Sequence, residues 1–501
     1  MNRRQLITTT AIAGAAIALS PLLLRGFRRS SSQADAALAP GTRVLKVVSR
    51  TLDINGKPAP VFGLAGPDGK PGLTFTEGER FQVALINKIN EPTIIHWHGL
   101  KPPFDQDGTP NAPMPLLTGG EIRHYDFPVG ATGTHWMHAH TLQEQNLLAA
   151  PLIVRAKDAA NSAEQEVVIL LHDFSFTPAQ ELLARLRKGG NMGGENMSKM
   201  DMSGMKMNGM TMDMPGMKMD GMTMDMPGMD MGGMKMDLND IEYDAYLAND
   251  RTLDDPEVVK VERGGKVRLR IINGAASTVF TIDTGEVDGT LLAVDGLATQ
   301  PVVGRRFPVA MGQRLDIALT VPADGNALPI LALREGAKER AGIILAPTGA
   351  VISKMAAKTD ADGPVMTLDF ESRLRAANPL AAKVADRTLR IMLMGNMMTY
   401  QWMLMPGGPL MVKEGERVNM VMANHTEMAH PMHLHGHAFQ VVGINGAVLS
   451  GALRDTVQIP PKSEVTVAFD ADHPGKWAFH CHHLYHMESG MMSSVGYEGV
   501  A

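Results

Sequence analysis

The chain repeats one short pattern three times, in TEGERFQVALIN (76–87), ERGGKVRLRIIN (262–273) and KEGERVNMVMAN (413–424). Each copy has a Gly turn, then alternating apolar and polar residues, then Asn. Alternation with a period of two predicts a strand with one buried face. Three copies spaced about 150 to 190 residues apart predict three similar β-domains.

The rest of the sequence favours an all-β fold. Many short strand-like segments with Gly and Pro turns separate the copies, as in β-sandwiches, and QELLARLRK (180–188) is one short helix candidate. A chain of 501 residues holds roughly two to four domains. We place the domains at 40–158, 159–350 and 360–501.

The N-terminus is typical of an exported protein. Arg3 and Arg4 precede an apolar stretch from about Thr8 to Leu24, which indicates a twin-arginine signal, and small residues at 34–39 suit cleavage. The alternative is an uncleaved membrane anchor, for which the apolar stretch is short. We therefore expect a signal peptide at 1–39, a periplasmic protein, and no stable membrane insertion after export.

Charge and cysteine content narrow the function. A net charge of -6 and a pI near 6.3 give no basic footprint for nucleic acid. Cys481 is the only cysteine, which excludes an intramolecular disulfide and leaves a free thiol, an intermolecular partner or a metal ligand.

Histidines recur in an H-x-H spacing at four places. The pairs are His96/His98 in HWHG, His138/His140 in HWMHAH, His433/His435 in HPMHLHGH and His480/His482 in HCHHLYH. The first and third pairs stand nine and eleven residues past the Asn that closes a repeat, whereas the same offsets in the second domain reach Ile282 and Thr284. The first and third domains therefore carry the pair at one structural position, and the second domain lacks it.

The sequence around Cys481 predicts two metal sites joined by one strand. On a strand, the imidazoles of His480 and His482 face one side and the thiolate of Cys481 faces the other. A Cys with two His and a weak axial Met is the blue-copper ligand set. The companions available are His430, His486 and Met491, with Met492 as the adjacent alternative to Met491. The eight histidines of the four pairs suit three further copper ions.

With these four motifs, in this order and spacing, the chain resembles the multicopper oxidases, and most of all the bacterial periplasmic CopA-like copper-resistance oxidases. The resemblance covers nearly the whole mature chain and implies three consecutive cupredoxin-like Greek-key β-sandwich domains. It also implies four copper ions that pass electrons from a donor to dioxygen, through Cys481 and its two histidine neighbours. The implied ligands are His430, Cys481, His486 and Met491 for type 1; His96 and His433 for type 2; and His98, His138, His140, His435, His480 and His482 for the type 3 pair.

Acidic residues near these motifs are candidates for proton delivery. Asp107, in FDQDGTP, stands nine residues past His98, where the family has an acid beside the cluster. The alternative interpretation of Asp107 is a turn residue, and Asp105 is the competing candidate nearby. Some cuprous oxidases have a second acid where this chain has Met487, followed by Glu488, so the second proton-relay acid is left open.

Methionine is concentrated in one low-complexity segment. Of 38 methionines, eighteen lie between Met192 and Met236, where GMKMNGMTMDMP recurs as GMKMDGMTMDMP. Residues 191–237 read as a disordered linker, and their thioethers also suit the capture of additional Cu(I). A second cluster, IMLMGNMMTYQWMLM (391–405), alternates like a strand, and we expect half of its methionines in the core.

The remaining histidines are assigned to supporting roles. His124, His172, His425 and His473 are isolated and predicted to be structural. His135, His437 and His483 lie inside motifs but off the ligand spacing, which suits hydrogen bonding behind the ligands.

Three functions fit these features. The first is oxidation of Cu(I) by dioxygen for copper resistance, by a monomer. The second is a laccase-like oxidation of small phenolic donors, and the third is non-catalytic periplasmic copper binding. A nitrite reductase fits less well, because it needs no trinuclear cluster.

Overall fold

The computed structural model describes residues 39–110, 113–159, 162–189 and 238–500. The predicted insertion at 191–237 and all but the last residue of the predicted leader lie outside these ranges. In the described ranges, no helix combines the length and the hydrophobicity needed to cross a membrane.

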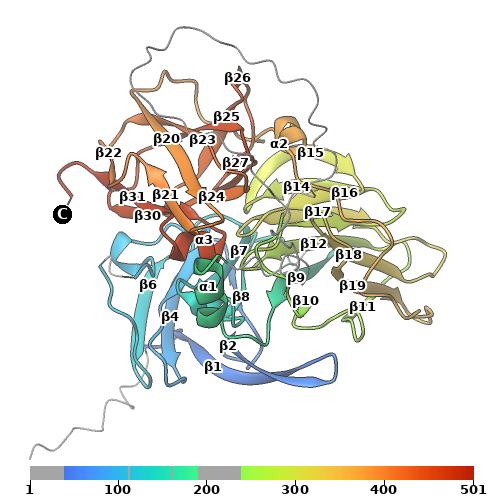
Figure 1. The fold of residues 1–501 in the computed structure, drawn as a ribbon. Helices are drawn as coiled ribbons and strands as arrows, with labels where there is room; N and C mark the ends of the chain where they lie inside the picture. Colours follow the sequence, from blue (N-terminus) through green and yellow to red (C-terminus); the bar gives the residue numbers. More distant parts are fainter. Residues whose placement is uncertain (1–38, 111–112, 160–161, 190–237, 501) are drawn as a thin grey trace, which may run out of the picture. The chain divides into compact units, whose positions relative to one another are not determined.

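The described chain folds into three consecutive β-sandwiches of two sheets each, as the sequence predicts (Figure 1). In the first, one sheet has the order β2 (Lys57–Ala65), β1 (Arg43–Ile54), β4 (Arg80–Asn87), β6 (Ile122–Pro128). The other has the order β3 (Leu73–Thr76), β8 (Ala149–Arg155), β7 (Gly133–Ala139), β5 (Ile95–His98).

The second sandwich is formed by β9 to β19. One sheet has the order β10 (Ala245–Ala248), β9 (Glu164–Phe174), β12 (Lys266–Asn273), β17 (Arg314–Thr320), β14 (Gly289–Val294), β15 (Leu297–Gly304). The other has the order β11 (Val258–Val261), β19 (Arg340–Pro347), β18 (Leu328–Arg334), β13 (Phe280–Asp283), β16 (Arg306–Val309).

The third sandwich is formed by β20 to β31. One sheet has the order β21 (Gln401–Met405), β20 (Arg387–Asn396), β23 (Arg417–Asn424), β29 (Glu464–Asp470), β25 (Phe439–Ile444), β26 (Ala447–Val448), and β27 (Leu453–Arg454) also pairs with β25. The other has the order β22 (Leu410–Val412), β31 (Met492–Tyr497), β30 (Lys476–Cys481), β24 (His430–Leu434), β28 (Thr456–Ile459).

Helices are few and short in the described residues. They are α1 (Ala179–Arg187), α2 (Leu368–Arg373) and α3 (Leu484–Glu488), with short 3-10 turns at Phe104–Gln106 and Leu142–Glu144. The predicted helix at 180–188 is thus confirmed as α1, which buries Leu182, Leu183 and Leu186 on one face.

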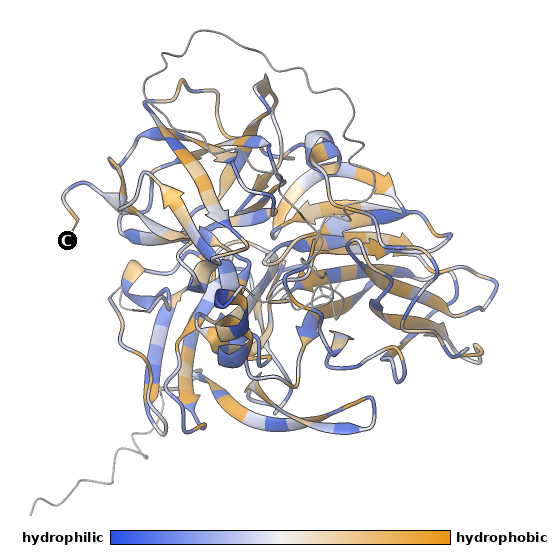
Figure 2. Ribbon diagram, viewed as in Figure 1, coloured by the Kyte–Doolittle hydropathy of each residue, from blue (hydrophilic) through white to orange (hydrophobic). Residues whose placement is uncertain are grey.

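The three sequence repeats occupy the same place in their sandwiches. Each is a turn followed by a central strand, β4, β12 or β23, which pairs in parallel with one neighbour and antiparallel with the other. Apolar and polar residues alternate along the long strands, as the banding of β1 in Figure 2 shows, so each strand has one face for the core.

The Asn that closes each repeat has the same role in all three sandwiches. Asn87, Asn273 and Asn424 are buried, and each side-chain oxygen accepts a hydrogen bond from the backbone N–H two residues later. Each side-chain amide donates to a carbonyl four or five residues later and to a second carbonyl 30 to 36 residues away. We call this arrangement the Asn clamp. It fixes the loop that leads to the H-x-H position, which in the second sandwich is occupied by the core residue Ile282.

The methionines of 391–405 correct one expectation. The core face of the β20–β21 hairpin carries Ile391, Leu393, Trp402 and Leu404, all buried. The methionines fall on the opposite phase of both strands, so the expectation that half of them belong to the core is wrong. Exposed are Met392, Met394, Met398, Met403 and Met405, and Met397 is partly buried.

Glu335 gives the fold a pH-dependent stability. It is buried, it accepts a hydrogen bond from the Met366 N–H at 2.7 Å, and burial raises its pKa to about 7. The folded-state pKa of this acid lies above its unfolded value. The unfolded chain therefore releases the proton first as pH rises, and stability falls between about pH 4.5 and pH 7.

We expect Glu335→Gln to raise the free energy of unfolding at pH 8 by at most roughly 3 kcal/mol, because the amide oxygen keeps the hydrogen bond without a charge. At pH 4 the variant and the parent should unfold at the same denaturant concentration. Denaturant unfolding at both pH values measures this, and an equal difference at both would contradict the assignment.

Candidate metal centres

Two neighbouring strands of the third sandwich place metal-ligand side chains on both of their faces. In the antiparallel pair β24–β30, Met432 lies opposite Cys481 and His433 opposite His480. Because side chains alternate, Cys481 points to one face, while His433 and His480 point to the other. The sequence predicts ligands on both faces of the strand that carries Cys481. The structure shows that the neighbouring strand β24 also belongs to this arrangement.

The first centre is a compact group of Cys481, His430 and His486. The Cys481 Sγ lies 3.7 Å from His430 Nδ1 and 3.8 Å from His486 Nδ1, and the two nitrogens are 3.1 Å apart. All three are buried. Met491 is buried and adjoins them through hydrogen bonds to Cys481 and His486, whereas its alternative, Met492, is 40% exposed.

Aromatic rings and an acid enclose this centre. The Trp402 ring lies 4.1 Å from the His486 ring, and the His483 ring stacks on the other side at 3.7 Å. Asp240 lies 3.1 Å from His486 Nε2 and accepts a hydrogen bond from Tyr400. Since Asp240 holds Nε2, His486 presents Nδ1 to the thiol.

The second centre is a cluster of eight buried histidines. The first sandwich contributes two histidines from β5, one from β7 and one directly after β7. The third contributes one histidine from β24, one from β30, and one directly after each of these strands. These are the members of the four predicted pairs: His96, His98, His138, His140, His433, His435, His480 and His482. The structure thus brings all of them together between the first and third sandwiches.

Three members converge as a metal-binding triplet. The Nε2 atom of His480 lies 3.0 Å from that of His435 and 3.2 Å from that of His140. Ligand nitrogens lie about 3 Å apart when each is about 2 Å from a shared ion, as in protein zinc sites. Three nitrogens at this spacing fit one metal ion.

Other members have a buried nitrogen with no hydrogen-bond partner. These are His96 Nε2, His98 Nδ1, His138 Nε2, His433 Nε2 and both nitrogens of His482. A buried polar atom without a hydrogen-bond partner costs roughly 1 to 3 kcal/mol of folding free energy. Several such nitrogens in one cluster therefore indicate that another group binds them. Metal ions at the centre of the cluster would fill this role, and imidazole suits copper.

Burial favours the neutral form in six members of the cluster, and the neutral imidazole is the form that binds metals. It lowers the pKa of His98, His138, His435, His480 and His482 well below the ordinary value, and lowers that of His140 to about 3. Burial also raises the pKa of the Cys481 thiol. A metal ion would therefore have to displace the thiol proton on binding.

Asp107 holds two histidines of the cluster. Its Oδ2 lies 2.7 Å from His435 Nδ1 and its carbonyl oxygen 3.0 Å from His96 Nδ1, and it is buried. Burial would raise the pKa of Asp107, but His96 and the hydrogen bonds lower it. Asp105, the neighbour considered from the sequence, is exposed.

Asp455 holds two more histidines and is itself held by an arginine. Its Oδ1 lies 3.1 Å from His98 Nε2, and its carbonyl oxygen 2.9 Å from His433 Nδ1. Arg314, fully buried, donates to both carboxylate oxygens at 2.7 and 2.6 Å and to the Thr134 carbonyl. The second sandwich, which has no histidine in the cluster, thus supports it through Arg314.

Glu144 is a third acid at the cluster. Its Oε2 lies 2.8 Å from His138 Nδ1, and its unpartnered Oε1 lies 3.9 Å from His482 Nδ1. Burial raises the pKa of Glu144 well above its ordinary value. It fixes which nitrogen of His138 faces the cluster, whereas Glu488, the acid noted in the sequence, is partly exposed near α1.

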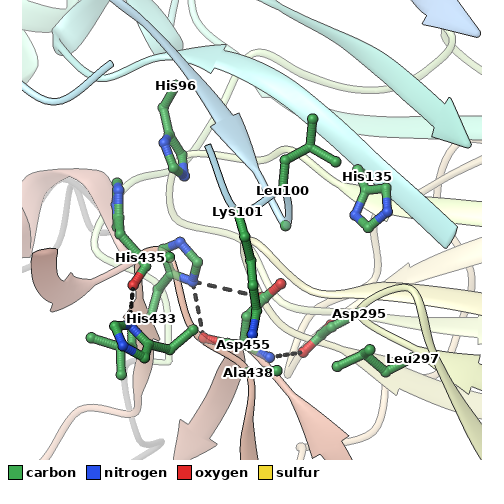
Figure 3. A pocket seen from close by; sticks show the side chains of 14 residues that line it. His96, Leu100, Lys101, His135, Asp295, Leu297, His433, His435, Ala438 and Asp455 are labelled. Atoms are coloured by element: carbon green, nitrogen blue, oxygen red, sulfur yellow. Dashed lines mark hydrogen bonds and ion pairs between the residues drawn. The ribbon is translucent and has the colours of Figure 1, made fainter. Parts of the chain in front are cut away.

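A small cavity of about 50 Å³ borders the cluster. His96, His433 and His435 line it together with Lys101, His135 and Asp455 (Figure 3). Figure 3 shows Asp455 joined by dashed lines to His433 and to Asp295. The space suits a molecule of the size of water or dioxygen.

Several of these groups could not be found from the sequence. Asp455, Arg314, Glu144 and Asp240 belong to no repeated spacing, and only the position of Glu144 four residues past His140 was a local signal. Of the histidines assigned to supporting roles, His483 stacks on His486, and His437 hydrogen-bonds the His435 carbonyl at 3.0 Å and Tyr497 at 2.6 Å.

Comparison with known families gives one consistent description. Family models described as multicopper oxidase match residues 46–159, 165–343 and 378–498. The multicopper oxidase MmcO of Mycobacterium tuberculosis is 29% identical over 85% of this chain and 81% of its own length. Copper resistance protein A of Escherichia coli is 25% identical over 99% of both chains.

Solved structures share the fold. Fet3p, described as a multicopper oxidase that functions in iron import, has a TM-score of 0.70 at 17% identity, covering 91% of this chain and 90% of its own. The laccase-like multicopper oxidase CueO of Ochrobactrum sp. has a TM-score of 0.66 at 18% identity, covering 92% and 97%.

We expect Asp455→Asn to destabilise the protein by at most about 3 to 5 kcal/mol, because it removes the carboxylate that Arg314 contacts at 2.6 Å and leaves this buried charge only Asp295, at 3.8 Å. It should also lower the copper content, because His98 and His433 lose their support. Asp316→Asn is the control, since Asp316 pairs with another mostly buried arginine, Arg270, which also keeps Glu166 as a partner. Denaturant unfolding and metal analysis measure both effects, and equal copper loss in the two variants would refute a specific role for Asp455.

We expect Cys481→Ser to remove about one copper ion per chain and the visible thiolate-to-copper absorption, because the hydroxyl is a poor soft ligand. Oxidase activity should be abolished, while the eight-histidine cluster keeps its metal. Metal analysis and the absorption spectrum test this, and loss of all copper would mean that the two centres are not independent.

Proposed function

This chain belongs to the multicopper oxidase family, and we propose that it oxidises Cu(I) with dioxygen as the acceptor. The family couples one-electron oxidation of a reductant to the reduction of dioxygen to water. For Cu(I), four cuprous ions, one dioxygen and four protons give four cupric ions and two waters. Relatives named copper resistance protein A support copper as the substrate.

One observation carries the choice of Cu(I). Both described flanks of the methionine-rich segment contact the Cys481 centre or its surroundings. On one side, Arg187 donates to the Glu488 carbonyl at the end of α3, two residues past His486. On the other, Asp240 lies against His486 itself. The described residues on both sides of a Cu(I)-selective sequence therefore lie beside the site where electrons would enter.

The ligand sets fit four copper ions, which supply electron transfer and dioxygen reduction when bound. The proposed type 1 ligands are His430, Cys481, His486 and Met491. The proposed type 2 ligands are His96 and His433, and the proposed type 3 ligands are His98, His138, His140, His435, His480 and His482.

The chain links the two centres through adjacent residues. Cys481 lies between His480 and His482, so its backbone is the shortest covalent connection from the first centre to the second. The His480 Nδ1 also lies 2.9 Å from the Cys481 carbonyl oxygen, which orients its Nε2 toward His140 and His435. We assign Asp107 to proton delivery, because it contacts ligands of both the proposed type 2 and type 3 sets.

A laccase-like activity is the second candidate, and a pocket favours it. A cavity of about 560 Å³ between the second and third sandwiches is lined by His483, Met428, Met366 and Met311, among others. Most of its lining is apolar, and His483 stacks on His486. A small phenol would fit there, close to the proposed type 1 centre.

We place this activity in the periplasm, in a monomer exported by the twin-arginine route. This proposal rests on Arg3-Arg4 and the apolar stretch that follows, and it suits a protein that acquires copper before export. Copper binding without catalysis is the remaining alternative.

We expect the copper-loaded chain to consume dioxygen with Cu(I) as the sole reductant. Deleting residues 191–237 should lower this rate at least roughly tenfold, because losing a soft-ligand contact worth about 1.4 kcal/mol has that effect. An oxygen electrode measures the rate beside a phenolic donor. The phenol rate of the deletion variant is the control for an intact oxidase.

Cuprous oxidation unchanged by the deletion would refute the role of the methionine segment. Faster phenol oxidation than cuprous oxidation in the full chain would favour the laccase-like activity. Copper tolerance that survives Cys481→Ser in cells would favour binding without catalysis.

A further inference from the structure

We propose that four exposed methionines on the β20–β21 hairpin form a separate surface site for Cu(I). They are Met392 and Met394 on β20 and Met403 and Met405 on β21. We call them the methionine array. The array lies in the described part of the chain, outside residues 191–237 in the sequence, and none of its members belongs to the two candidate metal centres.

Strand register brings the four side chains together. In the antiparallel pair β20–β21, Met392 lies opposite Met405 and Met394 opposite Met403. Side chains directly opposite have Cβ atoms about 5 Å apart, and the two pairs stand two residues apart on one face. Methionine has three rotatable bonds, so the four sulfurs can converge on one ion without backbone movement.

Packing does not explain these residues. Their exposed fractions are 43% for Met392, 36% for Met394, 43% for Met403 and 39% for Met405. The inner face of the same hairpin is filled by Ile391, Leu393, Trp402 and Leu404. Solvent-facing strand positions ordinarily carry polar side chains, and exposing four thioethers in one patch loses the benefit of burial. β21 appears in the hydrophobic shades of Figure 2 although two of its methionines face outward.

The chemistry of the array selects a soft ion. Thioethers bind Cu(I) in preference to hard ions such as Mg²⁺ or Ca²⁺. The outer face of the hairpin carries no carboxylate, since its other members are Arg390, Asn396 and Gln401. His425, at the end of the neighbouring strand, is also exposed, and its N–H donates to the Leu393 carbonyl. This backbone contact places His425 beside β20, the strand that carries Met392 and Met394.

The array lies on the reverse side of a wall of the proposed type 1 centre. Trp402 is on the inner phase of β21, next to Met403, and its ring contacts those of His486 and His430 at 4.1 and 5.2 Å. One strand therefore separates a bound Cu(I) from that centre. A role in feeding Cu(I) to the oxidase rests on the proposed function, whereas binding at the array does not.

Silver(I) is a redox-inert probe for the array. The holoenzyme, labelled with ¹³C in its methionine methyl groups, would be titrated with Ag(I) and followed by NMR, with signals assigned by single Leu substitutions. We expect the signals of Met392, Met394, Met403 and Met405 to shift together with one midpoint. Met411 is the matched control, because it is 41% exposed on β22 and outside the array.

Variants test whether the four act as one site. Replacing all four with Leu should reduce bound Ag(I) by about one ion per chain, and Met411→Leu should not. The double variant Met392→Leu/Met405→Leu is a milder change that should weaken binding at the other pair if one ion is shared. Thermal unfolding checks that each variant is folded.

Two results would overturn the proposal. One is that the four methionine signals shift with separate midpoints, and the other is that they shift only at Ag(I) concentrations at which the Met411 signal also shifts. Because Ag(I) binding needs no turnover, failure of cuprous oxidation would refute the proposed function and leave the array intact. If the unaltered chain binds no Ag(I) at the four methionines but oxidises Cu(I) normally, the array alone is refuted.

Discussion

The alternation of side chains along β24 and β30 is the constraint on which the rest of the site depends. It places Cys481 on one face and His433 and His480 on the other. Two centres can therefore share two short strands, and the distance between them is fixed by backbone geometry. Any slip of the register by one residue would exchange the faces and destroy both centres together.

A cluster of eight buried imidazoles also needs partners on its outer side. Asp107, Asp455 and Glu144 fix the outer nitrogens, so that the inner nitrogens face the metal positions. Arg314 stabilises the ionised form of Asp455, because burial alone would raise the pKa of that acid. The second sandwich thus contributes electrostatics to a site whose histidines come from the other two.

The sequence was sufficient for the parts of the structure that follow local periodicity. The three repeats, the four H-x-H pairs and Cys481 are all visible as spacings, and the structure brings the histidines together as those spacings predict. Asp455, Arg314 and Asp240 were missed because their partners lie far away in the chain, where no spacing connects them. The methionines of 391–405 were misjudged because alternation reveals two faces without revealing which one is buried, and the inward phase was set by Ile391, Leu393, Trp402 and Leu404.

The Asn clamp has a consequence for how such a chain can change its length. Between Asn87 and His96, and between Asn424 and His433, the path is braced by side-chain hydrogen bonds, so an added or deleted residue would move the histidine out of the cluster. The second sandwich keeps its clamp without an H-x-H pair, and the long methionine-rich segment is inserted in that same sandwich, before its clamp at Asn273. An insertion is thus tolerated when it lies outside the segments that join a clamp Asn to an H-x-H pair. The length of those segments is fixed by the position that the histidines must reach.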